Sequence, residues 1–137
     1  MALPSVGGGR QLGDGNLNEA VIGSIPAPIT LSTGDFTLTA AQLTGGIILA
    51  SPGASAGNYT LPTGALLDQL LTNAKVGSSF DVSVVNIDGS GSGLITLVTN
   101  TGWTLVGLMT VAATAGTAQI FRARRTGDGT WTLYRVG

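Results

Sequence analysis

The residues that could carry catalytic chemistry are few in this chain. It contains no histidine and no cysteine, which excludes the commonest general base, the commonest transition-metal ligand, a thiol nucleophile and any disulfide or zinc cluster. An enzyme would have to rely on carboxylates or on a serine–lysine pair. The available groups are Asp14, Glu19, Asp35, Asp68, Asp81, Asp88, Asp128 and Lys75.

The placement of these groups does not indicate an active site. Most of the carboxylates lie in turn sequences, where aspartate is favoured because it hydrogen-bonds to nearby backbone, and no spacing suggests the pair used by glycoside hydrolases. The loop "DGSGSG" (88–93) lacks the further carboxylates of a calcium site. The stretch "GGGRQLGDG" lacks the strand, lysine and helix of a phosphate-binding loop. We therefore expect no enzymatic activity, no cofactor, no metal and no small-molecule substrate.

Four of the six basic residues lie in the C-terminal stretch "IFRARRTGDGTWTLYRVG" (120–137), which is either a nucleic-acid patch or a β-hairpin. A hairpin with a three-residue loop, Gly127 to Gly129, fits the β-forming residues on both sides. It predicts the cross-strand pairs Thr126–Thr130, Arg125–Trp131, Ala123–Leu133 and Arg122–Tyr134. The competing two-residue turn would place Arg122 opposite Arg135, which is unfavourable because like charges would face each other.

The hairpin register predicts one apolar and one polar face. The core face carries Phe121, Ala123, Trp131 and Leu133; the other face carries Arg122, Arg124, Thr132 and Tyr134. A net charge of −1 argues against nucleic-acid binding, which usually requires a strongly basic domain. Because residues 1–90 carry a net −4 and residues 91–137 a net +3, the patch suits an acidic protein surface. We predict a contact with a partner or a sister subunit at Arg122, Arg124, Tyr134 and Arg135.

From residue 29 onward the sequence reads as short strands separated by turns. The stretch "SFDVSVVNI" alternates apolar and polar residues, and "GGIILAS" is a short apolar strand. Eight or so strands at this spacing predict an all-β domain over 29–137, a jelly-roll-like β-sandwich or a small barrel. Trp103 could belong to a sugar-binding platform, but a tryptophan buried in the sandwich is the favoured interpretation.

One short helix is expected within "LPTGALLDQLLTNAKVG". Thr63 is a suitable N-cap and Gly77 a suitable stop, with Lys75 in the last turn. Its apolar residues form a single stripe that should cover one end or edge of the sandwich. They are Leu66, Leu67, Leu70, Leu71 and Ala74. We find no internal repeat.

Residues 1–28 differ from the remainder because they are rich in glycine and proline and show no period. Two interpretations are open: a disordered tail, or an extended arm that orders on a neighbouring subunit. The arm is favoured, because a solvating tail would not need so many aliphatic residues. Fully extended, it could reach on the order of 90 Å. The residues expected to contact a partner or a sister subunit are Leu3, Val6, Leu12, Leu17, Val21, Ile22 and Ile25.

Charged residues make up only 9 % of the chain, against about a quarter in an ordinary domain. Such a surface has little electrostatic protection against association, which favours an assembly protein whose surface is covered by other subunits. The longest apolar run is far too short for a membrane span. The N-terminus lacks the pattern of a secretory signal, so a soluble, non-secreted protein without a membrane partner is expected.

From Phe36 to the C-terminus, about three quarters of the chain, the layout resembles small structural proteins of tailed bacteriophages. The matching segments are "FTLTAAQLTGGIILASP", "YTLPTGALLDQLL", "SFDVSVVNIDGSG", "ITLVTNTGWTLVG", "AQIFRARR" and "TWTLYRVG". A "TLPTA-LL" step before a short helix and a final "T-Y" strand are similar to those of head-decoration (cement) proteins and some fibre modules. The family supplies no catalytic residues.

The resemblance implies a β-rich homotrimer, made in the bacterial host cytoplasm, that sits on the outer surface of the expanded capsid. It would bind at threefold or quasi-threefold sites, clamp neighbouring copies of the major capsid protein and so stabilise the shell. The alternative, of a different class, is a receptor- or glycan-binding module of a head fibre or tail fibre. That alternative predicts a concave site that combines polar and aromatic side chains.

Overall fold

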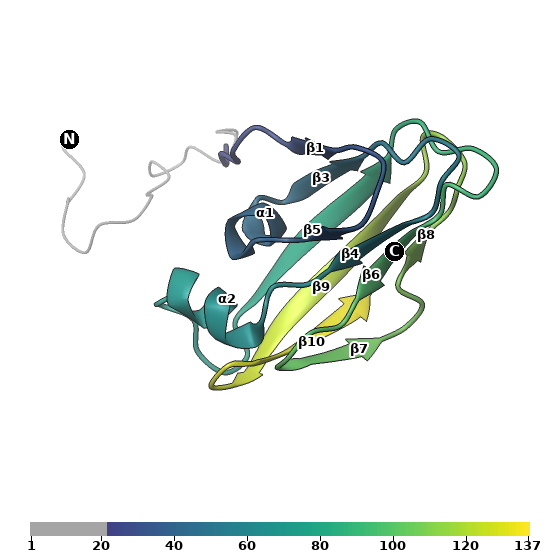
Figure 1. Ribbon diagram of the computed structural model, residues 1–137. Helices are drawn as coiled ribbons and strands as arrows, with labels where there is room; N and C mark the ends of the chain where they lie inside the picture. Colours follow the sequence, from purple (N-terminus) through teal and green to yellow (C-terminus); the bar gives the residue numbers. More distant parts are fainter. Residues whose placement is uncertain (1–21) are drawn as a thin grey trace, which may run out of the picture.

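The computed structural model describes residues 22–137 (Figure 1). Within that range the chain forms two β-sheets and two short helices, and the helices contact each other at one end of the sheets. In chain order the elements are β1 (Ile29–Leu31), β2 (Phe36–Thr37), α1 (Ala40–Thr44), β3 (Ile47–Ala50), β4 (Gly57–Thr60), α2 (Gly64–Leu70), β5 (Ser79–Asn86), β6 (Ile95–Val98), β7 (Trp103–Val106), β8 (Thr110–Val111), β9 (Ala118–Gly127) and β10 (Thr130–Arg135).

Consecutive strands alternate between the two sheets as far as β8. The larger sheet has the order β1-β3-β5-β9-β10-β7 and the smaller sheet has the order β2-β4-β6-β8. The chain leaves one sheet, forms a strand in the other sheet and then returns, so each new strand up to β6 runs parallel to the previous strand of its own sheet. The strands β1, β3 and β5 are therefore parallel to one another, as are β2, β4 and β6. The all-β, two-sheet expectation is confirmed. The jelly-roll order is not, because a jelly roll is built of antiparallel strands.

The C-terminal hairpin β9–β10 closes the larger sheet, and most of its predicted register is confirmed. Arg125 faces Trp131, Ala123 faces Leu133 and Arg122 faces Tyr134. The predicted Thr126–Thr130 backbone pair is wrong. The turn is two residues long and pairs Gly127 with Thr130, while Thr126 is skipped as a β-bulge. The bulge restores the register that a two-residue turn alone would have shifted.

The predicted helix is present but shorter than expected. Thr63 is its N-cap and accepts a hydrogen bond from the Leu66 amide at 3.2 Å, as predicted. The helix ends at Leu70 because Leu71 leaves helical geometry, with ψ at 66°. Gly77, which the sequence suggested as the stop, terminates a later turn with φ at 92°. Leu66 and Leu70 are about half exposed, so the predicted apolar stripe is buried only in part.

The helix α1 was not predicted from the sequence. Its sequence carries a capping box. The Thr39 side chain accepts from the Gln42 amide at 3.1 Å, and the Gln42 side chain accepts from the Thr39 amide at 3.0 Å. Leu43 of α1 and Leu67 of α2 are both fully buried. The two helices therefore close one end of the sandwich with one leucine each.

The core lies between the sheets and contains both tryptophans. Trp131 and Trp103 are 1 % and 8 % exposed, and their rings lie 6.2 Å apart. Trp103 donates its indole N–H to the Pro62 carbonyl at 2.6 Å. Trp103 is therefore a buried sandwich tryptophan, as the sequence indicated, and is not presented to a ligand.

Tyr59 on β4 is the one described residue whose buried side-chain oxygen lacks a hydrogen-bond partner. Burial raises the pKa of Tyr59 to about 12, and the Asp88 carboxylate adds to the rise. Its ring packs edge-on against Phe36 at 5.8 Å. Because an unpaired buried hydroxyl costs about 1–3 kcal/mol, Tyr59→Phe is expected to leave stability unchanged or to raise it by up to about 1 kcal/mol. Urea unfolding checks this, and a loss of stability would mean that a bound water satisfies the hydroxyl.

Candidate functional site

The described carboxylates hold the fold together. Asp35 accepts from the Asn58 amide at 2.9 Å. Asp88 accepts a hydrogen bond from the Ser51 hydroxyl at 2.6 Å and one from the Gly53 amide at 3.1 Å. Both bonds lower the pKa of Asp88, and the bond from Ser51 has the larger effect. The loop that begins at Asp88 is therefore a turn that ties two segments together. Among residues 22–137 no three metal-binding side chains cluster.

Asp68 on α2 is the most heavily bonded carboxylate in the described range. It accepts two hydrogen bonds from the Arg125 guanidinium, at 2.9 and 3.0 Å, one from the Trp131 indole at 3.0 Å and one from the Gly129 amide at 2.6 Å. Asp128 adds a second contact to Arg125 at 2.9 Å. These hydrogen bonds connect α2 to the turn of the β9–β10 hairpin. Arg125 is therefore a structural residue.

The environment of Asp68 predicts an acid-dependent loss of stability. The bond from Arg125, followed by those from the Gly129 amide and Trp131, lowers the pKa of Asp68 from its ordinary 3.8 to about 2. A lowered pKa contributes stability above pH 4 that is lost as the pH falls towards 2. Because the Asp68 side chain is 22 % exposed, we expect Asp68→Asn to cost about 2 kcal/mol at pH 7. It should also flatten the decline of stability below pH 4.

Asp81→Asn is the matched control for that experiment. Asp81 pairs with Arg122 at 2.7 Å, but the two side chains are 48 % and 53 % exposed, so solvent screens the pair. Its removal should cost clearly less than the removal of Asp68. Chemical unfolding measured from pH 2 to pH 7 compares the two variants. Equal losses would contradict the structural role given to Asp68.

The side of the larger sheet that faces away from the smaller sheet, here called the outer face, gathers three of the four predicted patch residues. Arg122 and Arg124 alternate with the buried Phe121 and Ala123 of β9, and Tyr134 of β10 lies opposite Arg122. The Arg122 guanidinium binds Asp81 on the neighbouring strand β5. Within residues 22–137 Arg124 has no acidic partner.

Arg135, the fourth predicted patch residue, belongs to the opposite side of the larger sheet. It faces the buried Phe121 across the hairpin, and its guanidinium donates to the Gln119 side chain at 2.5 Å and to the Leu108 carbonyl at 3.2 Å. The prediction that Arg135 joins the patch is therefore wrong. Every second residue of a strand lies on the same face of its sheet, so Arg135 shares a face with Leu133 and Trp131.

The outer face also carries aliphatic side chains beside the charged ones. Ile47 of β3, Ser83 of β5 and Ile120 of β9 lie in one row across the sheet. The next row holds Leu49 and Val85. The exposed fraction of Ile120 is 43 %, and the other three aliphatic residues are half-buried. Leu43 of α1 and Leu67 of α2 are buried in the core, so these leucines do not cover the outer face.

Five of the seven predicted arm residues, Leu3, Val6, Leu12, Leu17 and Val21, fall outside the described range. The other two, Ile22 and Ile25, are 75 % and 56 % exposed. The segment that follows runs beside α1, where a mainly apolar hollow of about 220 Å³ is lined by Pro26, Ala27, Ile29, Ala41, Gln42, Gly45 and Ile47.

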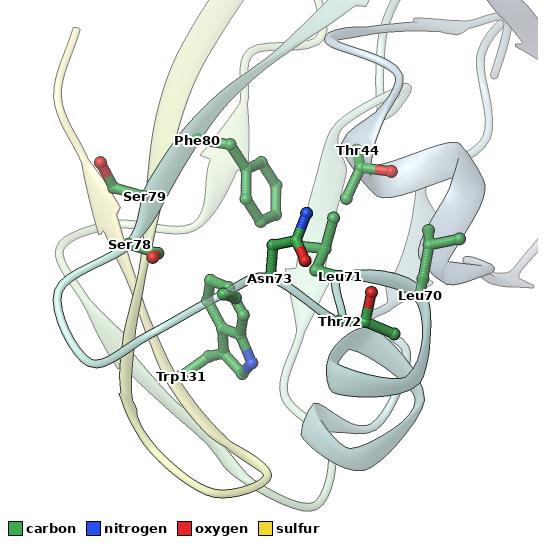
Figure 2. Close-up of a pocket in the computed structure, with 10 residues that line it drawn as sticks. Thr44, Leu70, Leu71, Thr72, Asn73, Ser78, Ser79, Phe80 and Trp131 are labelled. Carbon is green, nitrogen blue, oxygen red and sulfur yellow. The ribbon is translucent and has the colours of Figure 1, made fainter. Parts of the chain in front are cut away.

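A larger pocket, about 380 Å³ in volume, opens between α2, the end of α1 and the strands β5 and β10 (Figure 2). Phe80 and Trp131 form its aromatic wall, with their ring centres 5.7 Å apart. Leu70, Leu71 and Thr72 line the opposite side, and Asn73 projects between the two walls. The remaining lining residues are Thr44, Ala74, Ser78 and Ser79.

The sequence did not predict this pocket. Phe80 and Trp131 were assigned to core faces, and the segment after Leu70 was assigned to a continuing helix. The pocket exists because α2 ends early, so that residues 71–78 turn away and leave the Phe80 ring covered only in part. Trp131, which also lines the pocket, is 1 % exposed. The ψ angle of Leu71, on which this depends, has no signature in the sequence.

Comparison of the chain with protein-family models, with curated proteins and with solved structures returned no match. Within residues 22–137 neither helix has the length and apolar character that a membrane crossing requires.

Proposed function

We propose that this chain is a non-enzymatic structural protein of a phage virion. In this proposal it forms a homotrimer that decorates the outer surface of the expanded capsid at threefold or quasi-threefold sites and stabilises it. The observation that carries the proposal is the outer face of the larger sheet. It combines Ile120, which is 43 % exposed, and three half-buried aliphatic side chains with an Arg122–Asp81 pair whose charges already neutralise each other. A face that sets aliphatic side chains beside few uncompensated charges is typical of a surface that another subunit covers.

The stabilising action follows from mass action. A protein that binds only the assembled, expanded shell lowers the free energy of that state at each occupied site. A trimer that touches several copies of the major capsid protein adds avidity, so each contact can be weak. Arg124, which has no acidic partner within residues 22–137, and Ile25, which is 56 % exposed, are groups that could contact the capsid. Capsids with and without the protein should open at different temperatures.

The role of the outer face is tested by Ile120→Glu. Ile120 lies on that face in one row with Ser83 and Ile47 and is 43 % exposed. A charge there should leave the fold intact but prevent close packing of a second subunit, because an unpaired charge would be buried. Light scattering should report a lower mass for the variant than for the unmodified chain. Leu66→Glu, at a half-exposed position on α2, is the matched control and should keep the higher mass.

The second candidate function, a receptor- or glycan-binding module of a head fibre or tail fibre, is favoured by one observation. The pocket beside α2 combines aromatic and polar side chains, which is what that function requires. The copy number in purified virions separates the two functions: hundreds of copies favour a decoration protein and a handful favour a fibre.

A further inference from the structure

We infer that the pocket between α2 and the strands β5 and β10 binds a neutral saccharide unit. This inference names the ligand class for the second candidate function given above, the glycan-binding module, and does not depend on the proposed decoration role. Three properties of the pocket support it: its size, its lack of charge and the combination of aromatic and unpaired polar groups.

The size of the pocket suits a small ligand. Its volume of about 380 Å³ lies within the range of about 300–1,000 Å³ that ligand sites occupy. The aromatic wall is fixed in place, because the Trp131 indole donates to Asp68 at 3.0 Å and Phe80 packs on the same ring. Because these side chains are already held in place, ligand binding would cost less conformational entropy.

The lining residues exclude charged ligands as the preferred class. Not one of the ten lining residues is charged, so the pocket offers no counter-ion to a phosphate, a carboxylate or an ammonium group. A purely apolar ligand is disfavoured too, because it would cover polar side chains without pairing them.

The polar groups at the mouth of the pocket are available for hydrogen bonds. Within residues 22–137 the side chains of Thr72, Asn73 and Ser79 make no hydrogen bond, and the Ser78 hydroxyl accepts from the Lys75 amide at 2.9 Å and keeps its own proton to donate. Asn73 offers two donors and an acceptor, which match adjacent hydroxyls of a sugar ring. The apolar C–H face of such a ring can pack against Phe80, which is half-buried.

The experiment titrates the full-length, ¹⁵N-labelled chain with methyl glucoside, methyl galactoside and N-acetylglucosamine at millimolar concentration. We expect at least one probe to cause saturable shifts of the Asn73 side-chain amide and of the Trp131 indole N–H. The indole N–H of Trp103, which donates to a carbonyl inside the core, should not move. N-acetylneuraminic acid, a charged sugar, should bind more weakly than the best neutral probe.

Asn73→Ala should weaken the best probe about fivefold to tenfold, the effect of one or two lost hydrogen bonds. Asn58→Ala is the matched control, because Asn58 is an exposed asparagine on β4 outside the pocket, and it should leave binding unchanged. The inference is overturned if none of the three neutral probes gives saturable shifts, if only the charged sugar binds, or if Asn73→Ala binds as well as the unmodified chain. None of these results bears on the mass of the assembly.

Discussion

Replacing Gly64 with alanine is expected to lower the free energy of unfolding by about 3 kcal/mol. Gly64 is the first residue of α2, and a Cβ atom there would lie 2.0 Å from the carbonyl oxygen of Gly129. A Cβ on Gly102 would meet the same oxygen at 2.2 Å. Three backbone segments therefore meet at this corner, where only glycine fits. Since the obstacle is backbone, it cannot rotate away as a flexible side chain would.

The expected sign for Gly64→Ala depends on two opposing effects. Alanine would favour the helix by up to about 1 kcal/mol, but the overlap with the hairpin tip forces backbone shifts that cost about 1–3 kcal/mol or more. Those shifts would also break the bond between the Gly129 amide and Asp68. The control is Gly23→Ala, because a Cβ at Gly23 meets no atom within 4 Å. Urea unfolding should show a lower midpoint for the first variant alone; equal midpoints would contradict the packing described here.

Asn86→Leu is the second substitution with a large expected effect, again a loss of about 3 kcal/mol or more. Asn86 is fully buried at the end of β5. Its side-chain NH₂ group donates to the carbonyls of Gly93 and Ala112 at 2.9 and 3.0 Å, and its side-chain oxygen accepts from the Gly89 amide at 2.6 Å. Leucine has nearly the same size but would leave the Gly93 carbonyl and the Gly89 amide without these partners, each at a cost of about 1–3 kcal/mol, while the Ala112 carbonyl would keep only its bond from the Thr117 hydroxyl.

The control for Asn86→Leu is Asn58→Leu, since Asn58 is exposed and its side chain makes no hydrogen bond within the described range. Thermal unfolding followed by circular dichroism should show a much lower midpoint for Asn86→Leu and a nearly unchanged one for Asn58→Leu. A small effect at Asn86 would mean that water replaces the lost bonds, and that the loop from 87 to 93 is held by its own turns.

The local features of the fold could be predicted from the sequence, whereas the sheet order could not. Alternation fixed the buried face of β9 and β10, and the Thr63 cap marked the start of α2, because both depend on neighbours in the chain. The capping box formed by Thr39 and Gln42 is also local in the sequence, although the helix it begins was not predicted. The parallel winding depends on which sheet each short strand joins, and strands of two to four residues carry too little pattern to decide that.

The candidate sites illustrate the same limit. Arg122, Arg124 and Tyr134 could be placed on one face from the period of two, but Arg135 was misplaced because its alternation with Trp131 and Leu133 was not followed to the end of the strand. Both Asp68 and the pocket depend on contacts across more than fifty residues. No local spacing reports such contacts.

The measurement that tests the central proposal most directly is the solution mass of the purified full-length chain by light scattering at micromolar concentration. The proposed trimer predicts about 41 kDa, three times the chain mass of 13.7 kDa, with a return towards 13.7 kDa in Ile120→Glu. A mass of 13.7 kDa for the unmodified chain would contradict the proposal that the outer face joins copies of this protein.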